Sequence, residues 1–380
     1  MIQQVHPAQI HDHHFSETDM TILFYAIPVF LLLIGLELWV SRSRGLPVYR
    51  LKDTLTSLNI GLMSEFTKAI SGVIGVVMFM LISKNFGAYD WDTQNPLTWI
   101  SALILYDFCY YWVHRTGHEI NILWASHVIH HSSEEFNLST ALRQSSTGML
   151  FRWIFYVPLA LLGYPLQVFL VVGLVDLIYQ YWVHTQLIGK LGWMEKVFVT
   201  PSNHRVHHGQ NDYCIDKNYG GIFCIWDRMF GTYADERDDE KPTYGIRKPL
   251  ESWNPLWANV HHYLHIWHQV KGTSNWRHKL MYVFGGPSWS PPSTESTTTF
   301  SVTHFSRFDT PTPVVWVRVT FLLTAVASAA LMAFYAYQAH LTLPWIMALC
   351  GTFVVLLTLM GWLMTRRPSS MHRAQQALVA

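Results

Sequence analysis

The chain has 380 residues, of which 50% are apolar and only 13% are charged, with 17 Trp and 18 Tyr, a composition that favours an integral membrane protein over a soluble one. A net charge of +1 without a basic run argues against nucleic acid as a partner. The four cysteines are scattered and form no Cys-x-x-Cys pair, so the sequence indicates neither a disulfide framework nor a thiolate metal site.

Three apolar segments lie in the first third of the chain, at residues 21–40, 58–82 and 97–113. We predict that each forms a helix that crosses the bilayer. Four basic residues lie within 41–52, whereas the connection 83–96 has one lysine and two aspartates. Because positive charge collects on the cytoplasmic side of membrane proteins, we expect residues 41–52 to be cytoplasmic and the third span to return to that side.

Eight histidines form three clusters behind the third span. The clusters read HRTGH, HVIHH and HRVHH, and they contain His114, His118, His127, His130, His131, His204, His207 and His208. Residues three and four apart share a helix face, so each cluster can direct its imidazoles at one point. The number of ligands exceeds what one ion needs and predicts two metals. Many imidazoles without thiolate favour iron that cycles between oxidation states.

A further apolar segment, residues 149–183, is interrupted by Pro158, Gly163 and Pro165. We predict a hairpin of two spans that turns near Gly163 and returns to the cytoplasmic side. The sequence Tyr-Trp-Val-His closes both the third span, at His114, and this hairpin, at His184. We therefore expect His184 to join the metal centre as a ligand or a catalytic neighbour, the alternative being a hydrogen-bonding histidine at the interface.

The rest of the chain completes the predicted architecture. Residues 185–313 contain no spanning segment and hold about half of the charged residues, whereas 314–337 and 343–364 form a final membrane hairpin. The prediction is an all-α integral membrane protein with about seven spanning helices and a cytoplasmic, histidine-rich helical cap. We expect residues 1–380 to form one oxygenase domain, divided into the first three spans (21–113), the histidine-rich core with one hairpin (114–313) and the C-terminal hairpin (314–364).

Two other sets of histidines lie outside the clusters. One set has helical spacing in an amphipathic stretch that carries two tryptophans, and it consists of His261, His262, His265 and His268. For this set we favour packing at the membrane interface over metal binding. The other set, His11, His13 and His14, lies in the polar first 20 residues, which we interpret as a solvated tail.

The three clusters resemble the histidine pattern of the fatty acid hydroxylase and sterol desaturase superfamily, membrane oxygenases with a di-metal centre on the cytoplasmic side. The segments that resemble its ether-lipid-cleaving branch are 130–135, 137–145, 201–209, 213–220 and 225–232. The resemblance implies that the eight clustered histidines are metal ligands and that His184 is a further functional histidine. It also matches Glu119 to an acidic, catalytic position. Asn203 stands where the branch commonly has another histidine, which implies altered contacts around the ligands.

The resemblance also implies an activity. Hydroxylation of the ether-linked carbon of an alkylglycerol would give a hemiacetal that collapses to an aldehyde and a glycerol derivative. The implied cofactors are two iron ions, with zinc as a substitute in purified protein, and tetrahydrobiopterin or another electron donor. One alternative is a sterol or fatty-acyl desaturase or hydroxylase, and a second is a membrane protein with structural zinc and no catalysis. The expected location is a bacterial inner membrane, with a lipid as substrate.

Overall fold

The computed structural model describes residues 17–292, 302 and 305–365, and all regular secondary structure within these ranges is helical. The α-helices are α1 (Glu17–Ser43), α2 (Leu51–Phe86), α3 (Pro96–Glu119), α4 (Asn121–Trp124), α5 (Val128–His131), α6 (Leu138–Ala141), α7 (Met149–Arg152), α8 (Val157–Leu161), α9 (Leu166–Trp182), α10 (Pro201–His207), α11 (Ile225–Phe230), α12 (Pro255–Gly272), α13 (Trp276–Phe284), α14 (Val314–Tyr337) and α15 (Leu343–Thr365). The predicted all-α class is confirmed. The predicted tail with His11, His13 and His14 lies outside the described residues.

Four helices in the described part of the chain are long and apolar enough to cross a membrane. They are α1 over Ala26–Ser43, α2, α14 and α15. These helices coincide with the first, second and last two predicted spans. The predicted third span lies within α3, which has 24 residues but is not among the helices that combine spanning length with sufficient hydropathy. Four of the seven predicted spans therefore meet this criterion.

The predicted hairpin at residues 149–183 consists of shorter helices than expected. α7, one 3₁₀ segment and α8 form its first half, and the 17-residue α9 forms the second. Proline lacks a backbone N–H and favours helix starts, which explains why α8 begins around Pro158 and α9 follows Pro165. The turn occurs at the predicted Gly163, which has a φ of +81° and whose added Cβ would lie 2.2 Å from the Tyr89 carbonyl oxygen. Only glycine fits this position.

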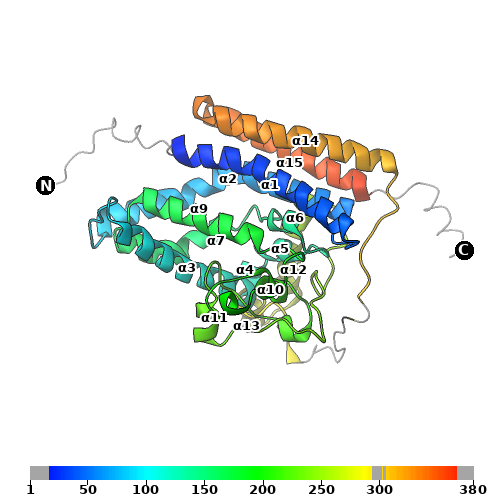
Figure 1. The fold of residues 1–380 in the computed structure, drawn as a ribbon, viewed down its shortest axis with the longest axis horizontal. Helices are drawn as coiled ribbons and strands as arrows, with labels where there is room; N and C mark the ends of the chain where they lie inside the picture. The colour runs from blue at the N-terminus through cyan, green and yellow to red at the C-terminus, as the bar shows by residue number, and fades with distance from the viewer. Residues whose placement is uncertain (1–16, 293–301, 303–304, 366–380) are drawn as a thin grey trace, which may run out of the picture.

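The long helix α2 is shared by two packed groups of helices. Around Phe66 it contacts α14 and α15, and Phe66 stacks on Phe353 with 3.9 Å between ring centroids. Around Phe79 it contacts α8 and α9, which in turn pack against α3, and Phe79 stacks on Phe169 at 4.2 Å. Accordingly, α14 and α15 lie at one edge of the bundle and α3 lies at the other (Figure 1).

Large apolar side chains are exposed on the outer faces of the long helices. They include Leu32, Leu36 and Trp39 on α1, Leu322 and Val326 on α14, and Val355 and Leu359 on α15. An apolar surface of this extent on helices of spanning length is stable in contact with lipid chains. The exposed faces therefore agree with membrane insertion.

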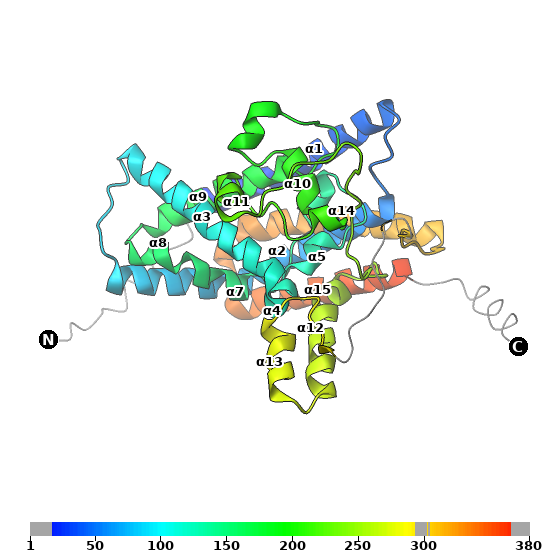
Figure 2. The same cartoon turned by 90° about the horizontal axis from the view of Figure 1, so that it is seen from below.

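The short helices α4–α6 and α10–α11, together with α12 and α13, form a cap where α3 and α9 end. Within it, α12 and α13 form a hairpin that lies across the direction of the long helices (Figure 2). Asn121 fastens this hairpin to the end of α3, because its side chain donates a 2.8 Å hydrogen bond to the Tyr282 carbonyl. Gly361 of α15 fits closely against Asn254 and Pro255 at the start of α12. The cap is thus fixed to helices on both sides of the bundle.

Candidate metal centre

The structure brings all nine predicted histidines together in two neighbouring groups that can each hold a metal ion. The first group consists of His114, His118, His127, His131 and His207, and the second consists of His130, His184, His204 and His208. Within each group the candidate ligand atoms lie within 4.8 Å of one another. The role of these histidines as ligands stays a prediction, but the predicted convergence of the three clusters with His184 is observed.

The sequence clusters do not correspond one to one with the spatial groups. His127 and His131 face the first group, whereas His130 faces the second. In HRVHH, His204 and His208 face the second group and His207 faces the first. The reason is helical geometry, since residues four apart share a face and adjacent residues point in different directions. Two clusters therefore supply histidines to both groups and hold them side by side.

Backbone carbonyl groups orient several of these imidazoles. In each case Nδ1 lies 2.7–3.1 Å from a carbonyl oxygen, and the pairs are His114 with Tyr219, His207 with Lys217, His130 with Arg143, and His184 with Gln180. A carbonyl oxygen only accepts, so Nδ1 carries the proton and Nε2 keeps its lone pair. Such contacts fix the orientation of metal-binding histidines.

The Nε2 atoms of the first group have the character expected of free ligand atoms. Those of His114, His118 and His207 are buried and have no hydrogen-bond partner among the described residues. Leaving a buried polar atom unpaired costs about 1–3 kcal/mol. A bound cation would remove that cost, so these residues fit a metal ion.

In the second group the Nε2 atoms converge on one another. The distances are 3.3 Å between His130 and His184, 2.9 Å between His184 and His204, and 3.1 Å between His204 and His208. Nitrogen ligands about 2.0–2.1 Å from one metal ion are themselves separated by about 3 Å. The spacing of this group therefore also fits a metal ion.

Burial keeps the histidines in the form that binds metals. It lowers the pKa of His207 to about 4. Burial, reinforced by neighbouring histidines, also lowers the pKa of His130, His131 and His204 well below its ordinary value. The neutral imidazole is the ligand, so the buried site needs no deprotonation near pH 7.

Arg205, inside the HRVHH cluster, fixes the position of α10. Its guanidinium group makes a buried pair with Glu236 through two hydrogen bonds of 3.0 and 2.7 Å. It also donates to the carbonyls of Thr185 and Ile188, at 3.0 and 2.7 Å. One side chain thus connects the helix of the third cluster to the segment that follows His184.

Buried ion pairs connect the loop after α5 to the start of α2. Arg50 pairs with Glu134 at 2.9 Å and with Glu135 at 2.5 Å. The fully buried Arg143 pairs with Asp53 at 3.3 Å, and its carbonyl is the partner of His130. These supporting residues were not predicted from the sequence. Their motif, SSEE directly after HVIHH, was the available signal.

Two aspartates hold the loop that carries the carbonyl partner of His114. Asp227 accepts a 2.7 Å hydrogen bond from the backbone N–H of Tyr219. Asp107, on α3, accepts one of 2.6 Å from the N–H of Ile222. The carbonyl of Tyr219 is thereby aligned with His114, so the orientation of this imidazole depends on two carboxylates that do not bind it directly.

Glu119, predicted to be catalytic, is not a member of either group of histidines. Its carboxylate accepts a 2.9 Å hydrogen bond from Arg115, and its side chain is 40% exposed. The pair lies one helical turn apart on the surface of α3. A catalytic role for Glu119 stays a prediction.

Asn203, the departure from the histidine pattern, closes the first turn of α10. Its side-chain oxygen accepts a 3.0 Å hydrogen bond from the backbone N–H of Thr200, and its amide donates to the Tyr233 hydroxyl at 3.1 Å. These contacts resemble a capping box, in which the third helical residue binds back to the N-cap. The residue therefore supports the helix that carries three site histidines.

Among the described residues, the histidines of α12 belong to neither of the two histidine groups that could hold a metal ion. His262 forms a 2.7 Å hydrogen bond with the Asn121 side chain, and His261 contacts the Ala258 carbonyl of its own helix at 3.0 Å. His268 is exposed. Packing of this face at the membrane interface stays a prediction.

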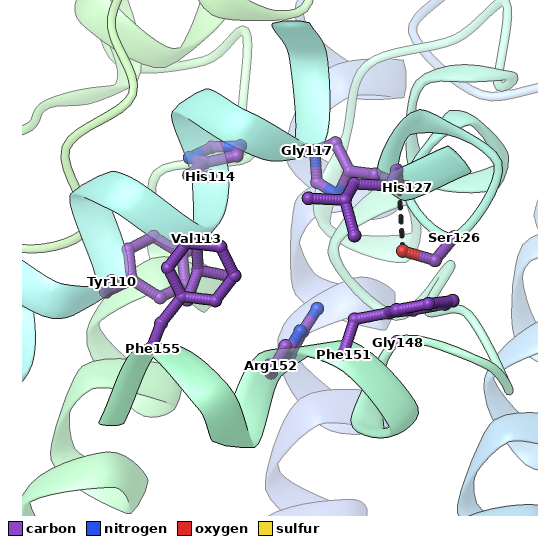
Figure 3. A pocket seen from close by; sticks show the side chains of 11 residues that line it. Tyr110, Val113, His114, Gly117, Ser126, His127, Gly148, Phe151, Arg152 and Phe155 are labelled. Carbon is purple, nitrogen blue, oxygen red and sulfur yellow. Dashed lines mark hydrogen bonds between the residues drawn. The ribbon is translucent and has the colours of Figure 1, made fainter. Parts of the chain in front are cut away.

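A cavity opens beside the first group of histidines (Figure 3). His114 and His127 form one side of it, and Phe151, Arg152 and Phe155 face them from the segment of α7 and the following 3₁₀ turn. The cavity gives a small molecule access to the histidines through mainly apolar walls.

A helical bundle with lipid-compatible faces and paired histidine groups defines a membrane protein with a candidate histidine-rich metal site. The fatty acid hydroxylase family profile matches residues 99–232. Alkylglycerol monooxygenase of Homo sapiens is 39% identical over 350 residues, which cover 91% of this chain and 78% of that protein. The Danio rerio alkylglycerol monooxygenase is 44% identical over 272 residues, which cover 70% of this chain and 59% of that protein.

A more distant relative is the ornithine lipid hydroxylase of Rhizobium tropici, 28% identical over 203 residues that cover 51% of this chain and 61% of that protein. No solved structure matches the chain. The chain belongs to the fatty acid hydroxylase family and, within it, to the group of alkylglycerol monooxygenases. The predicted family and the predicted enzyme class, a monooxygenase in a multi-pass membrane protein, are confirmed.

Proposed function

We propose that this protein is a di-iron monooxygenase that hydroxylates the ether-linked carbon of an alkylglycerol. The single observation that carries the proposal is the pair of buried histidine groups, in a chain 39% identical to an alkylglycerol monooxygenase over 91% of its length. The ligands of one iron would be His114, His118, His127, His131 and His207. Those of the other would be His130, His184, His204 and His208.

The proposed reaction inserts one oxygen atom of O₂ into the C–H bond next to the ether oxygen. The second oxygen atom becomes water, with two electrons from a donor and two protons. The product is a hemiacetal, which collapses to a fatty aldehyde and a glycerol. The bound iron ions would supply the oxygen-activating chemistry. We propose tetrahydrobiopterin as the electron donor, and zinc as the metal that replaces iron during purification.

The residues around the histidines have defined roles in this proposal. The Nδ1 contacts of His114 and His184 keep Nε2 available as the ligand atom. Phe136 is fully buried, with its ring centroid 5.1 Å from that of His208 and 4.9 Å from that of Tyr244, so it excludes water from the second group. Water exclusion protects a reactive oxidant from side reactions. Glu119 would be a further catalytic residue, as the family resemblance implies.

The proposal includes an arrangement in the membrane. Seven spans, with the histidine cap on the cytoplasmic face of a bacterial inner membrane, would bring the centre next to lipid substrates. The packing of α8 and α9 against α2, and of α3 against α9, supports the three additional spans. Contacts of α12 with α2 and α15 support one domain over residues 1–380.

Turnover of a defined lipid tests the proposed function. Purified, iron-loaded protein would be supplied with a 1-O-alkylglycerol, ¹⁸O₂ and tetrahydrobiopterin. We expect a fatty aldehyde, trapped as its hydrazone, and consumption of O₂ that depends on both lipid and donor. Desaturation or hydroxylation of a sterol or acyl chain under the same conditions, without ether cleavage, would instead support the desaturase alternative. If the purified protein holds two zinc ions and the iron-loaded protein shows no turnover, the result would support a structural role for the histidine centre.

A further inference from the structure

Arg152 is the last residue of α7 and lies on the wall of the cavity beside the histidines. Its side chain is partly buried and points from α7 toward the side of the cavity formed by His114 and His127 (Figure 3). Phe151 and Phe155 flank it on the same wall. The position is therefore suited to contact a ligand that enters the cavity.

Within the described part of the chain, Arg152 has neither a hydrogen bond nor an ion pair. Other arginines near the site are paired with carboxylates: Arg50 with Glu134, Arg143 with Asp53, and Arg205 with Glu236. A guanidinium group offers five N–H donors, and leaving them unsatisfied away from bulk water is costly. The contrast with the paired arginines indicates that the hydrogen-bond acceptor of Arg152 belongs to a bound ligand.

The guanidinium lies against the backbone of Gly148, and no carboxylate of the cavity lining balances its charge. Gly148 lies one turn before Arg152, and a Cβ added there would lie 3.4 Å from Nε and 3.6 Å from Cζ. None of the described residues that line the cavity is acidic. Apart from the histidines, Arg152 is the one ionisable basic or acidic side chain among the described residues that line this cavity. A cavity of this kind attracts an anionic ligand.

We propose that Arg152 is a specificity-determining residue that pairs with an oxyanion, namely a phosphate group, on the headgroup of the lipid substrate. The planar guanidinium group matches two oxygens of a phosphate at once. Phe151 and Phe155, with Val113 and Leu123, provide an apolar surface for the alkyl chain of the lipid. The three carbons of glycerol separate such a phosphate from the ether carbon, so the former can lie at Arg152 while the latter faces His114 and His127.

This inference rests on the proposed ether-lipid activity for its substrate, but its test includes binding that needs no turnover. Two substrates of equal chain length are compared, a 1-O-alkylglycerol and the same lipid with a 3-phosphate. The variants are Arg152→Met and Arg152→Lys, with Arg277→Met as the control because Arg277 is an exposed arginine on α13 that rests on Trp276. Iron content is measured for each variant to verify that the site is assembled.

For Arg152→Met, we expect the ratio of kcat/KM for the phosphorylated lipid to that for the neutral lipid to fall roughly tenfold to a hundredfold, mainly through KM. Arg152→Lys should recover part of the ratio, because it keeps the charge but not the planar fork. Arg277→Met should leave the ratio unchanged. An unchanged ratio in Arg152→Met, or an equal loss for both lipids, would overturn the proposal.

Equilibrium binding separates this inference from the proposed function. The phosphorylated lipid is titrated into the wild type and Arg152→Met by calorimetry, in detergent and without electron donor, with inorganic phosphate alone in a parallel titration. Weaker binding of the phosphorylated lipid in the variant supports the inference even if no ether lipid is oxidised. Equal binding in both proteins overturns it, as does inorganic phosphate that binds as tightly as the lipid, because the lipid headgroup would then not be the ligand.

Discussion

The Nε2 atoms of His130 and His184 lie 3.3 Å apart, although each imidazole donates its Nδ1 proton to a backbone carbonyl. In the neutral state two lone pairs therefore face each other, and no hydrogen bond can form between them. A cation between these atoms replaces repulsion with two coordinate bonds. His130 lies in the cap and His184 follows α9, so a metal ion here would join the cap to the membrane helices.

The metal content of one variant tests the division of the histidines into two groups. We expect two metal ions per chain in the wild type and about one in His184→Ala, because His184 belongs to the second group alone. The measurement is elemental analysis of purified protein, with iron in the growth medium. His268→Ala, at an exposed histidine of α12, serves as the matched control and should retain both ions. A wild type that holds one ion at full occupancy would contradict the two-site arrangement.

The support of His114 by the loop around Tyr219 leads to a second prediction. Asp227→Asn removes the charged acceptor of the Tyr219 N–H, so the carbonyl that orients His114 loses its fixed position. We expect the affinity for the first metal ion to fall about 10-fold to 100-fold. Competition with a chelator measures it.

Asp212→Asn is the control for this experiment, since Asp212 is an exposed aspartate whose partner is Arg247 on the surface. It should bind metal like the wild type. If Asp227→Asn and Asp212→Asn bind metal equally well, the Tyr219 loop does not tune the site.

Local sequence patterns were sufficient to predict the helical class, the long membrane helices and the convergence of the histidines. Apolar length identified α14 and α15 almost to the residue, and glycine between prolines identified the turn at Gly163. These features depend on neighbours in sequence. The spacing of four also placed His127 with His131, and His204 with His208, in the same group.

The features that were missed depend on residues far apart in the chain. We expected each cluster to direct its imidazoles at one point, but His130 and His207 each join histidines from other parts of the chain instead of the rest of their own cluster. The carbonyl of Tyr219 is 105 residues from His114, and a backbone acceptor has no signature in residue type. The hairpin at residues 149–183 was predicted as two full spans because its composition is apolar throughout, whereas its prolines divide it into shorter helices.

The buried pair of Glu236 with Arg205 predicts a pH-dependent contribution to stability. Burial opposes ionisation of Glu236, but the hydrogen bonds and charge of Arg205 hold its pKa below its usual value. The unfolded state therefore binds the proton more tightly, so the pair stabilises the fold above a pH of about 4.5 and this contribution is lost as the pH falls further. Removing one partner of a buried pair costs roughly 3 kcal/mol.

Glu236→Gln should therefore lower the free energy of unfolding at pH 7.5, and its deficit relative to the wild type should shrink below a pH of about 4.5. Denaturant unfolding in detergent, followed by tryptophan fluorescence, measures both values. Asp238→Asn, at an exposed carboxylate of the same segment, should have little effect at either pH. A deficit that stays constant with pH would show that the charge of Glu236 is not what stabilises the fold.

The side of the membrane on which the cap lies can be tested with single cysteines. Ser43 at the end of α1 and Arg237 in the cap are exposed, as is Asp90 in the connection between α2 and α3. If the cap is cytoplasmic, Ser43→Cys and Arg237→Cys should resist an impermeant maleimide in intact cells and react after permeabilisation, whereas Asp90→Cys should react in both. The four natural cysteines are buried, so background labelling should be low. Labelling of Arg237→Cys but not Asp90→Cys in intact cells would place the histidine cap outside and reverse the proposed orientation.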